Sequence, residues 1–112
     1  MRKATVLYKG DLAGTLTQHD DGSYTFVYQS EWVDNADKPQ ISLTLPKTHQ
    51  EYHSEYLFPF FYNILPEGTN KQMVCKQHRI DYDDYFSLLL ITAQSDAIGA
   101  VQIVKLNTDG TS

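Results

Sequence analysis

The sequence has few basic residues and only one cysteine. Nine lysines and arginines stand against fourteen aspartates and glutamates, so the formal net charge is -5 at pH 7. The longest basic cluster is Arg2-Lys3. Because phosphate backbones are bound by several converging cations, we expect no direct contact with nucleic acid. The lone thiol, Cys75, excludes an internal disulfide and fits a reducing compartment.

Features of membrane proteins and of enzymes are missing as well. No stretch approaches the roughly 20 apolar residues of a membrane span, and the N-terminus has no basic region followed by an apolar core. We therefore expect a cytoplasmic protein without membrane contact. There is no glycine-rich phosphate loop, no kinase catalytic loop and no Gly-x-Ser-x-Gly turn. The sequence predicts neither catalysis nor a cofactor.

A histidine pair forms the arrangement closest to a metal site. His49 and His53 are four residues apart, so on a helix they would share one face. The zinc-protease pattern needs glutamate directly after the first histidine, whereas Glu51 comes two residues later. A third ligand is not evident. A solvated segment is favoured over a metal site, and no metal is predicted.

The 112 residues fit a single domain, with a core over about residues 4–105 and a polar tail over 106–112. Residues 5–28 are rich in β-branched and aromatic side chains and are interrupted at two turns, Gly10-Asp11 and Asp20-Asp21-Gly22. This pattern predicts a meander of three strands. ISLTL, residues 41–45, alternates apolar and polar side chains and predicts a fourth strand. AVQIVKL near the C-terminus predicts a returning strand.

Helical periodicity begins after Pro46. Near residues 56–65, one helical face collects Leu57, Phe60, Phe61, Ile64 and Leu65. A second helix is predicted near 70–78, with Thr69 as its cap and with Met73 and Val74 buried. Asp81 is predicted to cap a third helix near 82–94. Strands, then about three helices, then one more strand predict an α+β domain in which an antiparallel sheet packs against the helices.

A sharp corner separates the first two predicted helices. It consists of Leu65, Pro66, Glu67, Gly68, Thr69 and Asn70. Proline stiffens the exit from the first helix and glycine permits a positive φ, so polar groups can be held outward at little entropic cost. The corner is therefore a candidate partner-binding surface, although a purely structural turn between packed helices fits it equally well.

Trp32, the sole tryptophan, is the other candidate for partner binding. It lies in the polar connection SEWVDNADKPQ, where we expect it to be exposed. A large amphipathic ring in such a place can serve as an interface anchor or as a lid over one edge of the sheet. Both readings are compatible with the sequence.

Four stretches coincide with one family: YKGDLAGTLTQHDDGSYTFVY, ISLTLP, PFFYNILPEGTNKQM and SDAIGAVQIV. Together they resemble the N-terminal subdomain 1 of HipA-type serine/threonine kinases, the toxins of bacterial toxin–antitoxin modules. The resemblance extends from about Ala4 to Val104. In a full HipA-type kinase the groups that bind ATP and transfer phosphate come later in the chain, so the resemblance implies a non-catalytic piece.

A free-standing subdomain of this kind is similar to HipS, the small component of HipB–HipS–HipT modules. The resemblance implies an antitoxin-like regulatory subunit that binds and restrains a HipT-like kinase, in a complex with a HipB-like helix-turn-helix protein. The alternative is a truncated N-terminal subdomain of a HipA-like kinase with a structural role only. Many relatives carry a bulky residue where this chain has Thr69, so we expect polar contacts there and not an aromatic plug.

Overall fold

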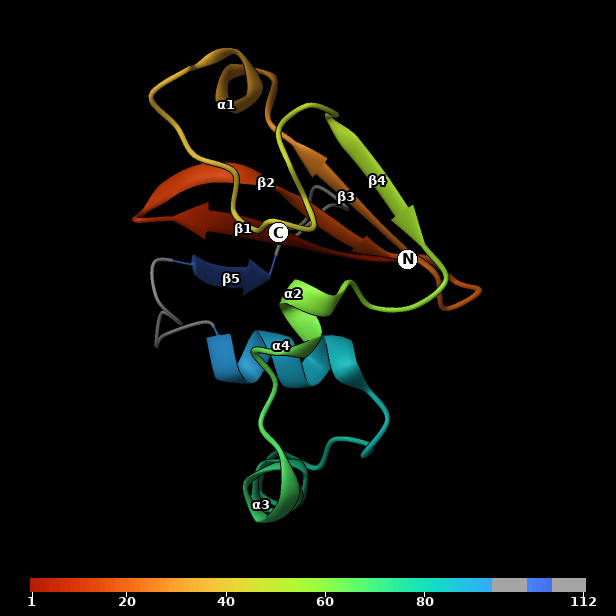
Figure 1. The fold of residues 1–112 in the computed structure, drawn as a ribbon. Coiled ribbons are helices and arrows are strands. Elements are labelled where there is room, and N and C mark those ends of the chain that lie inside the picture. Colours follow the sequence, from red (N-terminus) through yellow and green to blue (C-terminus); the bar gives the residue numbers. More distant parts are fainter. Residues whose placement is uncertain (94–100, 106–112) are drawn as a thin grey trace, which may run out of the picture.

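The computed structural model describes residues 1–93 and 101–105, and Figure 1 shows their arrangement. Among these residues, five strands form one antiparallel sheet in the order β4-β3-β2-β1-β5. The strands are β1 (Arg2–Tyr8), β2 (Asp11–Gln18), β3 (Tyr24–Tyr28), β4 (Glu51–Ser54) and β5 (Val101–Lys105). The helices are α1 (Ser30–Asp34), α2 (Pro59–Tyr62), α3 (Gly68–His78) and α4 (Tyr85–Ala93). The predicted α+β fold, its meander and its returning strand are confirmed.

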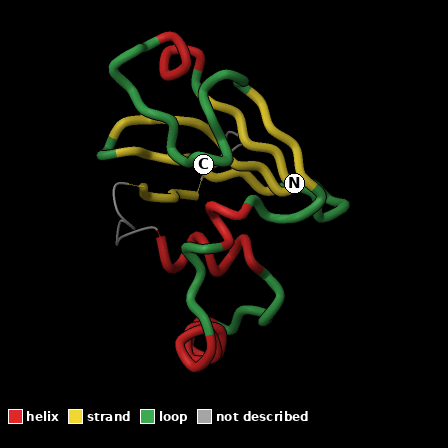
Figure 2. The backbone as a smooth tube through the Cα atoms, in the orientation of Figure 1, coloured by secondary structure: helices red, strands yellow, loops and turns green. Residues whose placement is uncertain are grey.

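The helices lie at different distances from the sheet. Figure 1 shows α2 next to the sheet and α3 farthest from it, and Figure 2 shows the loops that join these helices. α4 packs against β5. None of the described helices combines the length and the hydrophobicity needed to cross a membrane. Residues 94–100 and the predicted polar tail over 106–112 lie outside the described residues.

The hydrophobic core lies between the sheet and the helices α2 and α4. Strand side chains on this face, such as those of Val6 and Phe26, are fully buried, while Phe61 of α2 and Leu89 of α4 cover them. The Phe61 ring lies 5.8 Å from that of Phe26, measured between centroids. Because burial of apolar area is the main favourable term in folding, these contacts fix α2, and with it the start of the corner, against the sheet.

The strand predicted over residues 41–45 is wrong. These residues form turns, and the fourth strand is β4, ten residues later. Ile41 and Leu45 are buried, but Leu43 is 89% exposed. Inside the core, the Tyr28 hydroxyl accepts a hydrogen bond from the Ile41 N–H (3.1 Å) and donates one to the Leu45 carbonyl. A buried side chain therefore satisfies backbone groups that a neighbouring strand would otherwise bind.

Removing that hydroxyl tests its role. We expect Tyr28→Phe to lower the free energy of unfolding by about 1–3 kcal/mol, because a buried N–H and a buried carbonyl lose their partner. Urea denaturation measures the loss. Tyr56→Phe is the control, since Tyr56 is 76% exposed and should tolerate the change. Equal stability of the two variants would contradict this account.

The three predicted helices correspond in order to α2, α3 and α4, but their bounds differ, and the short helix α1 was not predicted. α2 is a single turn and not a helix over 56–65, because the backbone N–H groups of Ile64 and Leu65 bond three residues back, to Phe61 and Tyr62, and tighten the chain out of the helix. Leu57, Phe61 and Leu65 are nevertheless buried, as predicted.

α3 departs from the prediction at its start and in its buried face. It begins at Gly68, with Glu67 in the capping position and no side-chain cap bond, so the predicted Thr69 cap is wrong. The predicted burial of Met73 is also wrong, since this side chain is 61% exposed. Val74 is half-buried and Cys75 is buried. Because α3 stands away from the sheet, only a narrow strip of its surface is buried, and Met73 lies outside that strip.

α4 begins at Tyr85, later than predicted, and Asp84 takes the place expected for Asp81. The Asp84 carboxylate accepts hydrogen bonds from the Ser87 N–H (3.2 Å) and the Ser87 hydroxyl (2.7 Å). It also pairs with the Arg2 guanidinium at 2.7 Å, which ties β1 to the start of α4. Burial acts to raise the pKa of Asp84, but the hydrogen bonds from Arg2 and Ser87 outweigh it and lower the pKa below its ordinary value.

This lowered pKa makes part of the stability dependent on pH. The ionised carboxylate is favoured in the folded state, so its contribution is complete above the unfolded pKa, 3.8, and is lost as the pH falls through the lower folded value. We expect Asp84→Asn to lower the free energy of unfolding at pH 7. Below about pH 3.5 the free energies of unfolding of the variant and of wild type should lie closer together. Denaturation curves across this range measure the difference. If Asp84→Asn lowered the free energy of unfolding by the same amount at every pH down to about pH 2, the proposed role of the ionised carboxylate would be contradicted.

Candidate functional site

The predicted corner, residues 65–70, joins α2 to α3 and has a buried base with an exposed tip. Leu65 is buried and Pro66 half-buried, while the following four residues are exposed. Gly68 has φ +56°, and an added Cβ would meet nothing within 4 Å. Glycine is thus favoured here by backbone conformation and not by space, which confirms the positive φ expected from the sequence.

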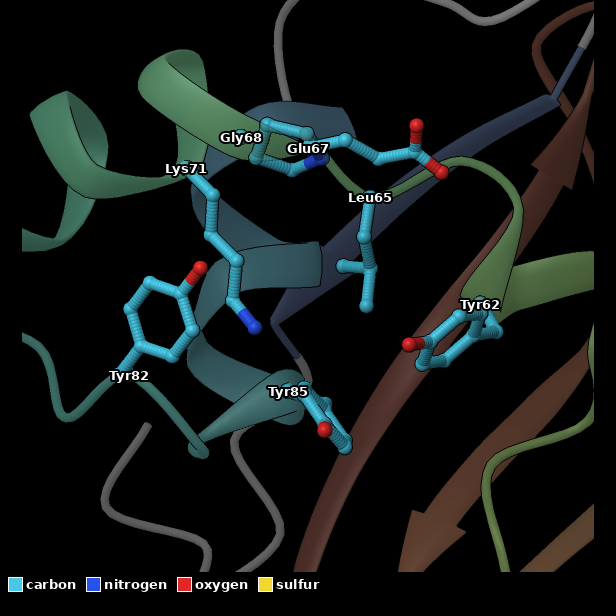
Figure 3. A pocket seen from close by; sticks show the side chains of 8 residues that line it. Tyr62, Leu65, Glu67, Gly68, Lys71, Tyr82 and Tyr85 are labelled. Atoms are coloured by element: carbon cyan, nitrogen blue, oxygen red, sulfur yellow. The ribbon is translucent and has the colours of Figure 1, made fainter.

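Beside the corner lies a hollow of about 260 Å³, which Figure 3 shows from close by. The corner forms one side, and the other sides come from α2, α3, α4 and the loop before α4. Its other lining residues are Tyr62, Lys71, Tyr82 and Tyr85. We call it the corner hollow. The sequence patterns did not indicate these four residues as part of a site, although the close spacing of the two tyrosines in DYDDY, residues 81–85, was a signal for an aromatic surface.

A lysine occupies the middle of the corner hollow without a counter-charge. The Lys71 Nζ lies 3.7 Å from the centroid of the Tyr82 ring and 5.0 Å from that of Tyr85. Figure 3 shows the ammonium reaching toward these rings, while the Glu67 carboxylate points away from it. Among the described residues, no carboxylate forms an ion pair with Lys71. Cation–π contacts therefore hold a positive charge in place without neutralising it.

Trp32 lies on α1, away from the corner, and its expected exposure is wrong: it is 3% exposed. Its indole N–H donates to the Pro39 carbonyl at 2.8 Å, and its ring meets that of Tyr8 at a centroid distance of 5.8 Å. Figure 1 shows α1 and α3 at opposite ends of the molecule. Trp32 thus packs against Tyr8, at the C-terminal end of the inner strand β1, and shares no surface with the corner.

The histidine pair does not lie on a helix. His49 is in a loop, and His53 is in β4, where its Nδ1 lies 2.9 Å from the Thr25 Oγ1 and its Nε2 lies 2.5 Å from the Glu51 carboxylate. In the described part of the chain, no three histidine, cysteine, aspartate or glutamate side chains are placed to hold a metal ion. Only His53 therefore lies on the sheet, where it bonds to Thr25 of β3, and the two histidines do not form one site.

Known proteins match this chain over most of its length. A family model described as the HipA N-terminal domain matches residues 4–104. A solved structure, the N-terminal domain of the HipA toxin, superposes with a TM-score of 0.71 at 28% identity and covers 97% of this chain and 96% of its own. An uncharacterized protein of Haemophilus influenzae is 32% identical over 92% of each chain.

Longer proteins contain a similar segment. Two proteins of Sinorhizobium fredii, each named a putative kinase, are 27% and 29% identical to this chain. The matches cover 93% and 92% of this chain but only 24% and 27% of those proteins. The shared segment is thus about a quarter of each putative kinase.

Proposed function

The chain belongs to the HipA N-terminal domain family, and on that premise we propose that it is a cytoplasmic, non-catalytic subunit that binds and restrains a HipT-like serine/threonine kinase. The relatives named putative kinases are about four times longer than this chain. The rest of each would supply the groups that bind ATP and transfer phosphate, which this segment lacks. The similarly short protein of Haemophilus influenzae supports a domain that acts as a separate chain.

The exposed tip on a buried base carries this proposal. Leu65 is anchored in the core, while Glu67 and the three residues after it stand in solvent beside a hollow that holds an unpaired ammonium. Such a preorganised surface loses little entropy when it is bound. Glu67 and Lys71 offer opposite charges to a partner, which favours one orientation of docking over others.

Restraint of the kinase then follows from polar contacts. Thr69 is too small to fill a deep pocket, so the corner would block or order a loop of the kinase through hydrogen bonds that the Glu67 carboxylate accepts and that the side chains of Thr69 and Asn70 donate or accept. The corner hollow would receive an acidic side chain of the kinase against Lys71. A HipB-like helix-turn-helix protein completes the proposed complex and provides its contacts with DNA.

Co-purification with the kinase tests the proposal. We expect an untagged HipT-like kinase to be retained on the tagged chain, and growth inhibition by that kinase to be relieved when both are expressed. In the presence of the kinase alone, growth should stop. Failure of the kinase to bind, or equal growth inhibition with and without the chain, would overturn the regulatory role.

A structural role inside a longer kinase is the second candidate, which the matches to the Sinorhizobium proteins favour. The mass of the native protein separates the two. A species near 12.8 kDa, detected in cells with an antibody to this domain, supports the separate subunit. A single species about four times heavier would support the structural role.

A further inference from the structure

A second hollow lies beside the first and differs from it in charge. It has a volume of about 440 Å³, and its lining includes Glu55, Tyr56, Tyr62, Asp83 and Tyr85. We call it the acidic tyrosine pocket. Tyr62 and Tyr85 line both hollows, and their rings meet edge to face with centroids 5.6 Å apart. The pair of rings is therefore a wall that the two hollows share.

The two carboxylates of this pocket are without partners. Among the described residues, neither Glu55 nor Asp83 forms a side-chain hydrogen bond or an ion pair, and no lysine or arginine lines the pocket. By contrast, Asp84, next in the chain, is bound by Arg2. Two negative charges in one hollow repel each other, and a cation placed between them would be attracted by both.

Exposed aromatic rings complete the pocket. Tyr56 is 76% exposed and Tyr62 is 49% exposed, which leaves large apolar faces in contact with water. Ring faces attract cations, and the flat guanidinium of arginine stacks on them better than a lysine ammonium does. Arginine also forms paired hydrogen bonds with a carboxylate. Rings and carboxylates in one pocket thus match a guanidinium in both shape and charge.

The chain already contains an arginine held by this combination of groups. The Arg2 guanidinium carbon lies 4.8 Å from the centroid of the Phe86 ring, while one of its nitrogens pairs with Asp84 at 2.7 Å. That arginine comes from β1 and binds at the start of α4. The acidic tyrosine pocket offers the same two kinds of group, a ring and a carboxylate, with no arginine of the described chain filling it.

We propose that the acidic tyrosine pocket binds an arginine side chain of the protein partner. The inference rests on the proposed function for the existence of that partner, and it names the chemistry that the partner must present. The kinase would then place a basic residue in this pocket and an acidic residue in the corner hollow, on opposite sides of the Tyr62–Tyr85 wall.

A titration of the free protein tests the pocket independently of the kinase. The probe is N-acetyl-arginine amide, followed through backbone amide shifts of the isotope-labelled full chain. We expect saturable shifts at Gly22, Leu57 and Tyr85, with a dissociation constant on the order of millimolar. The matching citrulline derivative, which is nearly the same shape but uncharged, should bind at least about tenfold more weakly, because it lacks the charge-assisted bonds.

Two double variants separate the pocket from general electrostatics. Glu55→Gln with Asp83→Asn removes both carboxylates and should weaken binding of the arginine probe about tenfold or more. The control, Asp34→Asn with Asp37→Asn, changes the net charge equally at exposed positions in and after α1. α1 follows the C-terminal end of β3, whereas Tyr24 at the other end of β3 lines the pocket. The control should bind as wild type does.

Several outcomes would overturn the assignment. The first is a set of amide shifts that never saturate. The second is binding of the citrulline derivative, or of the corresponding lysine derivative, as tight as that of the arginine probe. The third is an equal loss of affinity for the arginine probe in the two double variants. A wild-type dimer that dissociates in the Glu55→Gln, Asp83→Asn variant would also overturn it, since the occupant would then be a second copy. A kinase that fails to bind while the arginine probe binds would refute the proposed function and leave the pocket standing.

Discussion

Glu67→Arg is expected to weaken binding to a HipT-like kinase by about 10–100-fold, because a reversed charge would stand mispaired in a preformed interface. Glu67 is exposed and, among the described residues, its side chain makes no hydrogen bond or ion pair. Its replacement therefore breaks no hydrogen bond or ion pair within the described chain. Isothermal titration calorimetry with the purified kinase measures the loss, and thermal melting of the free domain checks that the fold persists.

A matched control is available at Glu31. Glu31→Arg makes the same charge reversal at another exposed glutamate, in the first turn of α1. Both variants lose a favourable interaction between a carboxylate and the start of a helix, which is typically worth about 0.3–1 kcal/mol. Any difference in affinity between them thus reports on the interface. Equal affinity of wild type and Glu67→Arg, with both folded, would remove the corner from the contact surface.

Phe61→Ala is expected to cost about 3–5 kcal/mol of the free energy of unfolding. Phe61 is fully buried, and its ring meets those of Phe26, Phe58 and Phe60 at centroid distances of 5.8, 6.3 and 5.2 Å. Truncation removes the residue that ties the single turn of α2 to the sheet and leaves a cavity behind. For a domain whose total stability is about 5–15 kcal/mol, this is a large fraction.

Urea denaturation of three variants separates cavity formation from other effects. Phe61→Leu keeps much of the buried volume and should cost clearly less than Phe61→Ala. Leu43→Ala, at a position that is 89% exposed, should lie within about 0.5 kcal/mol of wild type. The account fails if Phe61→Ala costs no more than Leu43→Ala. Because α2 leads into the corner, we also expect Phe61→Ala to weaken binding to the kinase.

Where local signals agreed with each other, the sequence was sufficient to predict structure. The turn at Asp21-Gly22 joins β2 to β3, and the alternation that predicted the last strand buries Val101 and Ile103 in β5. A hairpin turn and a period-two pattern are properties of neighbouring residues, so no distant contact is needed to specify them. The same holds for Gly68, whose positive φ follows from the break between two helical patterns.

The candidate site was predictable only in part, because some of its residues are brought together by contacts between distant parts of the chain. The corner itself could be read from proline and glycine, but the position of Lys71 over Tyr82 and Tyr85 depends on how α3 and α4 stand relative to each other. The acidic tyrosine pocket likewise joins Glu55 to Asp83, which are far apart in the chain. Sequence spacing says nothing about such pairs when no periodic pattern connects them.

The amino-acid sequence by itself determined the α+β class, the meander, the returning strand and the rigid corner, because each follows from local propensity and periodicity. Only the tertiary structure decided that residues 41–45 form turns and that Trp32 is buried. An alternating pattern marks which side chains avoid water, but it does not identify their partners. The buried Tyr28 hydroxyl binds the backbone of residues 41–45 at both ends, and a contact between such distant residues outweighs their local preference for a strand.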